Sequence, residues 1–179
     1  MTDVPPEPGS IIELLERDHL VVRGMLGSFD TTATHEWGEV FRQLVEYLVR
    51  HEIAEEEVVF PALREALPDA AATVDECEAE QHESERLLIE MERTSVTDPS
   101  FREMVGRLRD ALDAHLARED LVLVPMLRSL GSYEDAGIAS RYEVARTTAP
   151  ARPEGAVVPE RRLTRTGLVD RLRAAGRRR

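Results

Sequence analysis

The sequence predicts an all-α protein, an up-down-up-down four-helix bundle followed by a basic, flexible C-terminal tail. Apolar residues recur at spacings of three and four along four long segments, and no segment alternates with the two-residue period of a strand. Long helices joined by short turns lie antiparallel to their neighbours, which gives a bundle. We expect the bundle to span residues 9–131, and a C-terminal extension with a linker and the tail to span residues 132–179.

Start and stop signals locate the first two helices. Ser10 with Glu13 three residues later forms a capping box, which opens a helix that should end near Ser28. The second helix should begin after Thr34 and run a long way, with Pro61 near its end.

The same signals locate the other two helices. Pro68 opens the third helix, which should end before Ser95. Asp98 as N-cap and Pro99 at the first helical position open the fourth, and Gly131 is placed to terminate it.

The charge is unevenly distributed. Residues 150–179 carry a net charge of +6, which leaves −18 on residues 1–149 from the total of −12. The negative charge of residues 1–149 would repel nucleic acid and anionic membranes. If the protein has a protein partner, we expect the basic tail to bind it. We expect neither a membrane span nor a signal peptide, because no apolar run is long enough and residues 1–10 are acidic and proline-rich. The one cysteine, Cys77, fits a cytoplasmic location.

Three predicted helices have core-facing lines that are apolar except near the middle. His19 interrupts the first line, His51 and Glu55 the second, and His115 and Glu119 that of the fourth helix. The lines are Ile12, Leu15, His19, Val22, Leu26, Phe29; Trp37, Phe41, Leu44, Leu48, His51, Glu55, Val58, Ala62; and Phe101, Val105, Leu108, Leu112, His115, Glu119, Val122, Met126. On the third helix the best line is more polar and has His82 near its middle: Ala71, Val74, Glu78, His82, Glu85, Ile89.

These interruptions predict a metal site. A single core histidine is usually a hydrogen-bonded structural residue, but burying six such groups without partners would cost several kcal/mol each. Histidine and glutamate at positions i and i+4 project from one helix face, so both reach the same ion or ion pair. We therefore expect the metal ligands to be His19, His51, Glu55, His82, His115 and Glu119.

The pattern is duplicated along the chain. The segment from His51 through Glu55 to Pro61 recurs 64 residues later, and each copy has the form H-x3-E followed by P-x-L. Two helical hairpins related by a pseudo-twofold axis explain this repeat, and such symmetry suits two metals better than one. Nitrogen and carboxylate ligands without thiolate suit iron, manganese or zinc, and six of them favour a bridged iron or manganese pair.

The sequence resembles the hemerythrin-like or HHE cation-binding domain family over roughly residues 9–131. The resemblance rests on the histidines in RDH, HEIAEEEVVFP, EQHE and HLAREDLVLVP, which are His19, His51, His82 and His115. It implies a cofactor of two Fe ions with an oxo or hydroxo bridge, in which Glu55 and Glu119 are bridging carboxylates and the histidines are terminal ligands. It also implies an open iron position for dioxygen, peroxide or nitric oxide.

The chain departs from animal hemerythrins at two places. Those proteins have a second histidine one turn after the first on the third helix, where this chain has Arg86, and an aspartate one residue further along than Glu119, where Asp120 stands. These differences argue against oxygen carriage of the animal type. Glu78 or Glu52 would be a substitute ligand, or else a solvated acid.

The resemblance implies a protein that binds or reacts with a small diatomic or peroxide ligand. As an enzyme it would be catalase-like or nitric-oxide-consuming, although no residue has the features of a dedicated acid or base. Two alternatives stay open: an iron-sensing or iron-handling module that signals through the tail, and a bundle in which the metal is purely structural.

Overall fold

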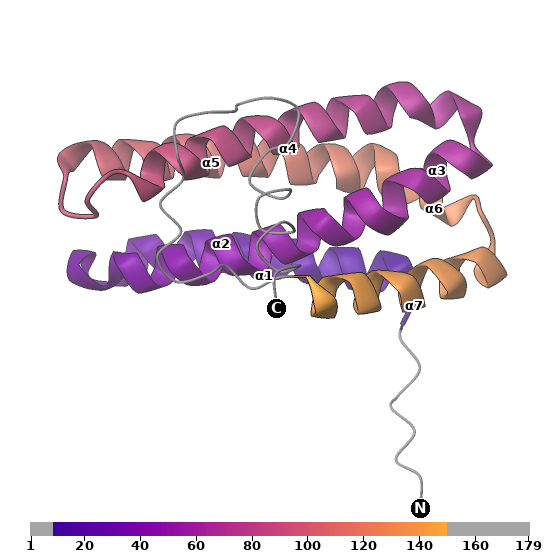
Figure 1. Cartoon of the computed structure of the whole chain (residues 1–179), viewed down its shortest axis with the longest axis horizontal. Helices are drawn as coiled ribbons and strands as arrows, with labels where there is room; N and C mark the ends of the chain where they lie inside the picture. The colour runs from indigo at the N-terminus through magenta and orange to yellow at the C-terminus, as the bar shows by residue number, and fades with distance from the viewer. Residues whose placement is uncertain (1–8, 150–179) are drawn as a thin grey trace, which may run out of the picture.

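The computed structural model describes residues 9–149 as a bundle of antiparallel helical rods (Figure 1). The helices are α1 (Ile11–Thr31), α2 (Trp37–Ala54), α3 (Phe60–Ala66), α4 (Ala71–Glu92), α5 (Pro99–Arg118), α6 (Val124–Arg128) and α7 (Ser132–Thr148). Short 3-10 turns at Thr34–Glu36 and Pro68–Ala70 precede α2 and α4. This confirms the predicted all-α bundle, while the predicted basic tail at 150–179 lies outside the described residues.

The predicted caps form at the starts of α1 and α5. The Ser10 hydroxyl accepts from the Glu13 backbone N–H at 3.1 Å, and the Glu13 carboxylate accepts from the Ser10 N–H at 3.0 Å. Asp98 accepts from the Ser100 N–H at 2.9 Å. Gly131, with φ of 91°, separates α6 from α7 in a conformation that residues with a side chain rarely adopt.

A π-helical turn joins α2 to α3 and another joins α5 to α6. The turns are Glu55–Val59 (η2) and Glu119–Leu123 (η4), and each closes with a backbone hydrogen bond to its glutamate from five residues later. Pro61 and Pro125 follow the turns at the same spacing. A proline inside a helix lacks an N–H and crowds the carbonyl four residues earlier, which accounts for a local widening at these points.

The π-turns shift the buried face of the helices by one residue. The predicted core lines hold up to Glu55 and Glu119, but beyond them Ala62, Val122 and Met126 are not buried. The buried residues are instead Leu63 in α3, and Leu123 and Leu127 around α6. The prediction was wrong at these ends because it assumed a constant period of 3.6 residues.

The core consists of two apolar clusters at opposite ends of the bundle. One contains Leu26, Leu48 and Leu112 among its buried residues, and the other contains Leu15, Phe60 and Leu127. The buried histidines and glutamates belong to neither cluster, and they lie on α1, α2, α4 and α5 and at the starts of η2 and η4. The polar layer is therefore bounded by aliphatic and aromatic side chains along the bundle axis.

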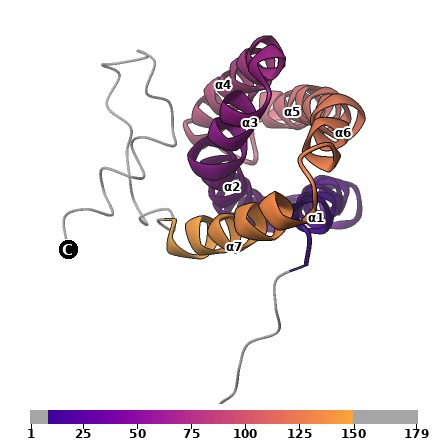
Figure 2. The same cartoon turned by 90° about the vertical axis from the view of Figure 1, so that its right-hand side faces the viewer.

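Helix α7 was not predicted from the sequence. It lies along the side of the bundle formed by α1 and α2 (Figure 2), and its Ile138, Ala139 and Tyr142 belong to the second apolar cluster. Asp135 accepts a hydrogen bond from the Ile11 N–H at 3.1 Å, which ties the start of α7 to the start of α1. Among residues 9–149, no helix combines the length and hydropathy that crossing a membrane requires.

Candidate metal centre

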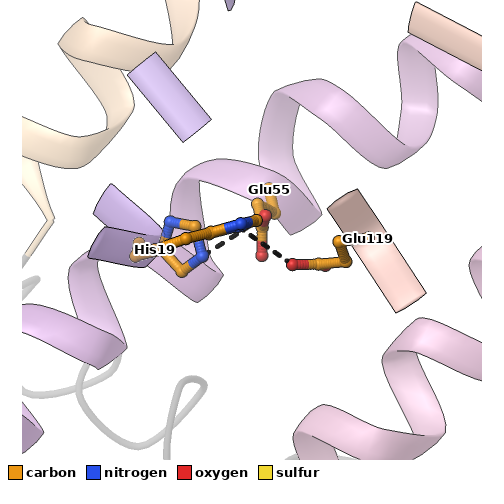
Figure 3. Close-up of side chains that lie close together, drawn as sticks. His19, Glu55 and Glu119 are labelled. Carbon is orange, nitrogen blue, oxygen red and sulfur yellow. Dashed lines mark ion pairs between the residues drawn. The ribbon is translucent and has the colours of Figure 1, made fainter. Parts of the chain in front are cut away.

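Four of the six predicted ligands converge in the middle of the bundle. His19 on α1, His51 on α2, Glu55 in η2 and Glu119 in η4 each offer a ligand atom, and these atoms all lie within 4.8 Å of one another. All four side chains are fully buried. Figure 3 shows His19, Glu55 and Glu119 pointing toward one another from different helices.

Glu119 lies between imidazoles from two helices. Its Oε2 is 3.2 Å from Nε2 of His19, and its Oε1 is 3.4 Å from Nε2 of His115. Glu55 is arranged in a similar way, with Oε1 3.4 Å from Nε2 of His51 and Oε2 accepting from the Gln81 amide at 2.8 Å. Glu119 therefore directs its two oxygens toward imidazoles of different helices, as a bridging carboxylate does, whereas Glu55 directs one oxygen toward an imidazole and the other toward the Gln81 amide.

In each of the three buried histidines, Nδ1 lies close to an oxygen atom of a residue outside this cluster. The contacts are His19 Nδ1 to Asp120 at 2.7 Å, His51 Nδ1 to the Tyr142 hydroxyl at 2.7 Å, and His115 Nδ1 to Glu80 at 3.4 Å. A carboxylate can only accept, and the Tyr142 hydroxyl already donates to Asp18, so Nδ1 carries the proton in each case. This leaves Nε2 with its lone pair toward the centre, which is how metal-binding histidines are oriented.

The atoms that face the centre lack hydrogen bonds. Within the described residues, Nε2 of His19, His51 and His115 and the facing oxygens of Glu55 and Glu119 are buried without a hydrogen-bond partner. Buried polar groups without partners are costly, and a cation satisfies imidazole and carboxylate lone pairs together. The donor set thus fits a metal ion, and it contains the nitrogen and oxygen ligands that iron, manganese and zinc accept.

Burial and neighbouring charges shift the pKa values of the groups at the centre in different directions. Burial and the neighbouring Glu119 raise the pKa of Glu55 well above its ordinary value. Burial opposes ionisation of Glu119 as well, but His115 and His19 outweigh it, so the pKa of Glu119 is lowered. Burial also acts to lower the pKa of His19, and Glu119 and Asp120 reverse this, so its pKa is raised.

A buried network continues outward from His51. The Tyr142 hydroxyl donates to Asp18 at 2.9 Å, and Tyr47 donates to the other oxygen of Asp18 at 2.8 Å. Burial acts to raise the pKa of Asp18, but the nearby His51, together with Tyr47 and Arg146, holds it well below its usual range. Asp18 therefore stays ionised and fixes the direction of the hydrogen bonds toward His51.

Tyr142→Phe is expected to weaken metal binding by about 10–100-fold, the usual effect of removing the outer partner of a ligand histidine. The substitution removes the only oxygen within hydrogen-bond distance of His51 Nδ1 among residues 9–149, since Asp18 lies 3.8 Å away. Tyr47→Phe is the matched control because it also removes a hydroxyl from Asp18 but does not touch His51. Equal affinities of the two variants in a competitive metal titration would contradict this role.

Helix α4 differs from its prediction. Glu78 and His82 are only partly buried, whereas Val74, Cys77, Gln81, Ser84, Glu85 and Leu88 form the buried line. The core-facing line expected for this helix is confirmed at Val74, Glu85 and Ile89, and it is wrong at Ala71, Glu78 and His82, which are not buried. The structure brings His115 to Glu119 but does not bring His82 into the cluster, and the assignment of all six residues as ligands stays a prediction.

Sequence reasoning missed several residues that support the centre. Asp18 adjoins His19, but its position gave no sign that it would be buried beside Tyr47. Tyr142 had a detectable signal, because Ile138, Tyr142 and Ala145 follow helical spacing and are all buried. Gln81 lies next to His82 and gave no signal of its own.

A helical bundle with a buried histidine and glutamate cluster defines a cation-binding protein of the four-helix type. Residues 10–146 match the hemerythrin HHE cation-binding domain family, and the chain belongs to this family.

Two known proteins are similar to the chain. A DNA nickase from Nostoc sp. is 30% identical over 118 residues, which cover 65% of this chain and 33% of the nickase. The chain thus spans about a third of that relative's length. The crystal structure of a hemerythrin HHE cation-binding domain-containing protein from Mycobacterium kansasii has a TM-score of 0.67 at 21% identity, covering 79% of this chain and 90% of that one. At this identity the likeness concerns the fold.

Proposed function

We propose that the protein holds two iron ions, with an oxo or hydroxo bridge, and binds or reacts with dioxygen, peroxide or nitric oxide at that pair. The observation that carries the proposal is Glu119, whose two oxygens lie 3.2 and 3.4 Å from imidazoles of different helices. A carboxylate placed in this way has one oxygen for each of two ions. Glu55 would be the second bridge, and His19, His51 and His115 would be terminal ligands.

The surroundings of the centre support chemistry with a small neutral ligand. Apolar clusters lie on both sides of the buried centre along the bundle axis, and apolar surroundings protect an oxidised centre from side reactions with water. When bound, the metal pair would supply the redox chemistry. The protein groups hold the ligand imidazoles in one tautomer and keep Asp18 ionised behind them.

Metal analysis with visible spectroscopy tests the proposal. Protein purified from iron-supplemented cells should contain about two irons per chain and show oxo-bridge absorption in the near ultraviolet. These bands should change when peroxide or nitric oxide is added. Zinc, or a spectrum that does not respond to any of the three ligands, would refute the proposed chemistry and leave a structural metal bundle.

Iron sensing is a second candidate, favoured by the contact of Tyr142 with His51. Helix α7 carries Tyr142 and leads directly into residues 150–179, so the state of the centre has a physical route to that segment. The same spectroscopic experiment separates the candidates, because a sensor would bind iron without consuming oxidant. A partner protein for residues 150–179 is part of this second proposal.

We do not extend DNA nicking to this chain. The match covers 33% of the Nostoc nickase, and a net charge of −18 on residues 1–149 opposes contact with a phosphate backbone. A reducing cytoplasm is the location we propose, consistent with the buried free thiol of Cys77.

A further inference from the structure

Two of the three tyrosines of the chain donate to the same buried carboxylate. Tyr142 on α7 donates to one oxygen of Asp18 on α1 at 2.9 Å, and Tyr47 on α2 donates to the other oxygen at 2.8 Å. Helix α7 lies against both α1 and α2 (Figure 2). A single carboxylate therefore links two phenols that come from opposite ends of the described chain.

The two tyrosines form a path from the centre toward the surface. Tyr142 is fully buried, and its hydroxyl accepts from Nδ1 of His51 at 2.7 Å. Tyr47 is half-buried, and the guanidinium carbon of Arg146 lies 5.8 Å from the centre of its ring. The path thus runs from His51 through Tyr142 and Asp18 to a phenol that solvent reaches.

The partner of His51 differs in kind from the partners of the other two buried histidines. Nδ1 of His19 and Nδ1 of His115 each contact a carboxylate, whereas Nδ1 of His51 contacts a phenol. A carboxylate is enough to orient an imidazole. A phenol can in addition give up an electron together with its proton, so a second phenol behind the first points to a redox role.

We propose that Tyr142 and Tyr47 form a relay that carries single electrons from a small phenol at the surface to the oxidised metal pair, with peroxide as the oxidant. The inference rests on the proposed function and adds a peroxidase-type activity to it. Peroxide takes up two electrons and two protons to give two waters, while two phenols each lose one electron and one proton. A phenol suits the relay because the exchange of an electron and a proton between two phenols changes the free energy little.

Asp18 accepts and returns the protons of the relay. When Tyr142 gives an electron through His51, its proton moves to the Asp18 oxygen that it already contacts. Tyr47 then gives an electron to Tyr142, while Asp18 returns the first proton and takes the Tyr47 proton on its other oxygen. The outside phenol finally gives an electron to Tyr47, Asp18 returns the second proton, and the oxidised phenol releases its own proton to water. Every protein group is then back in its starting state.

Peroxide treatment of the iron-loaded full chain tests the relay by electron paramagnetic resonance and by spin trapping. The wild type should give a radical whose spectrum changes when its tyrosines are ring-deuterated, and mass spectrometry should find the trap on Tyr47. Tyr142→Phe should lose the trap from Tyr47. Tyr47→Phe should oxidise para-cresol about tenfold more slowly per bound iron, or slower still. Tyr133→Phe changes the remaining tyrosine and is the matched control, which should equal the wild type in each measurement.

The outcomes separate the relay from the proposed function. A wild type without iron, or with absorption bands that ignore peroxide, dioxygen and nitric oxide, contradicts the proposed function and the relay with it. A wild type whose bands respond, but which gives no tyrosyl radical and no label on Tyr47, overturns the relay alone. Equal labelling of Tyr47 in the wild type and Tyr142→Phe, or para-cresol oxidation by Tyr47→Phe at the wild-type rate, also overturns it. Normalisation to bound iron removes the effect of the weaker metal binding expected for Tyr142→Phe.

Discussion

Glu119→Gln should abolish the binding of both metal ions under conditions that saturate the wild type. The substitution replaces one carboxylate oxygen by an uncharged amide nitrogen that cannot bind a cation. In the proposed two-ion centre, where Glu119 would be shared, both ions would therefore lose a ligand. Loss of an outer partner already weakens binding by about 10–100-fold, and loss of a shared ligand should weaken it by more. Metal analysis after dialysis and isothermal titration measure the effect.

Two variants control for folding and for charge. Glu103→Gln makes the same change at an exposed position of α5 and should bind metal as the wild type does. Glu119→Asp keeps the charge but shortens the side chain, and it should recover part of the affinity. A Glu119→Gln variant that still binds two ions would show that this carboxylate is not the bridge.

The metal-free protein should lose stability as the pH rises from about 6.5 to 8, and metal should restore it. The pKa values of Glu52, Glu55 and His19 are raised in the folded state, chiefly by burial for the glutamates and by Glu119 and Asp120, against burial, for His19. A raised pKa gives stability that is fully present below the unfolded-state value, 4.5 for Glu and 6.5 for His, and is lost as the pH rises through the folded-state value. Each proton that only the folded state holds lowers the free energy of unfolding by about 1.4 kcal/mol for every pH unit in this window.

Other groups titrate outside this window. The pKa values of Glu119 and Asp18 are lowered, so their contribution is lost only in acid, as the pH falls through those values. Burial lowers the pKa of His51, so its effect on stability changes mainly below its unfolded-state value of 6.5. Between pH 6.5 and 8, the change in the free energy of unfolding with pH therefore comes mainly from the groups whose pKa is raised.

Thermal unfolding with and without metal measures this effect. A metal present at a hundredfold excess over its Kd adds about 2.7 kcal/mol, or roughly 5–11 °C for a domain of this size. The gain should grow with pH because binding releases the protons that the ligands hold. Glu52→Gln should show a shallower pH slope without metal, since an amide does not titrate. A melting temperature of the metal-free protein that rises with pH across this window would refute the argument.

The fold and half of the centre could be predicted because their signals are local. Ser10 and Asp98 cap helices through residues two or three positions away, and the pairs His51 with Glu55 and His115 with Glu119 lie one turn apart on a single face. Such relations depend only on helix geometry, which every helix shares. The four-helix arrangement then follows from helix length and turn length.

The remaining parts depend on contacts between distant segments. Helix α4 has buried polar residues on its inner face and acids on its outer face, so polarity does not distinguish Gln81 from His82. The contact between Tyr142 and His51 joins residues 91 positions apart and depends on where α7 packs. The shift of the core line beyond Glu55 arises from a π-turn, and the nearest sequence signal for it was Pro61.

The paired π-turns also bear on the history of the chain. Each turn is one extra residue inserted into a helix at the same distance after a histidine, and the two insertions lie 64 residues apart. Independent origins would require the same rare insertion twice, at equivalent points, each followed by a proline. A single ancestral hairpin that already carried the insertion needs only one such event, followed by duplication and fusion. In that account the bulged glutamate is older than the bundle, and the first form of the metal centre was assembled from two identical hairpins on separate chains.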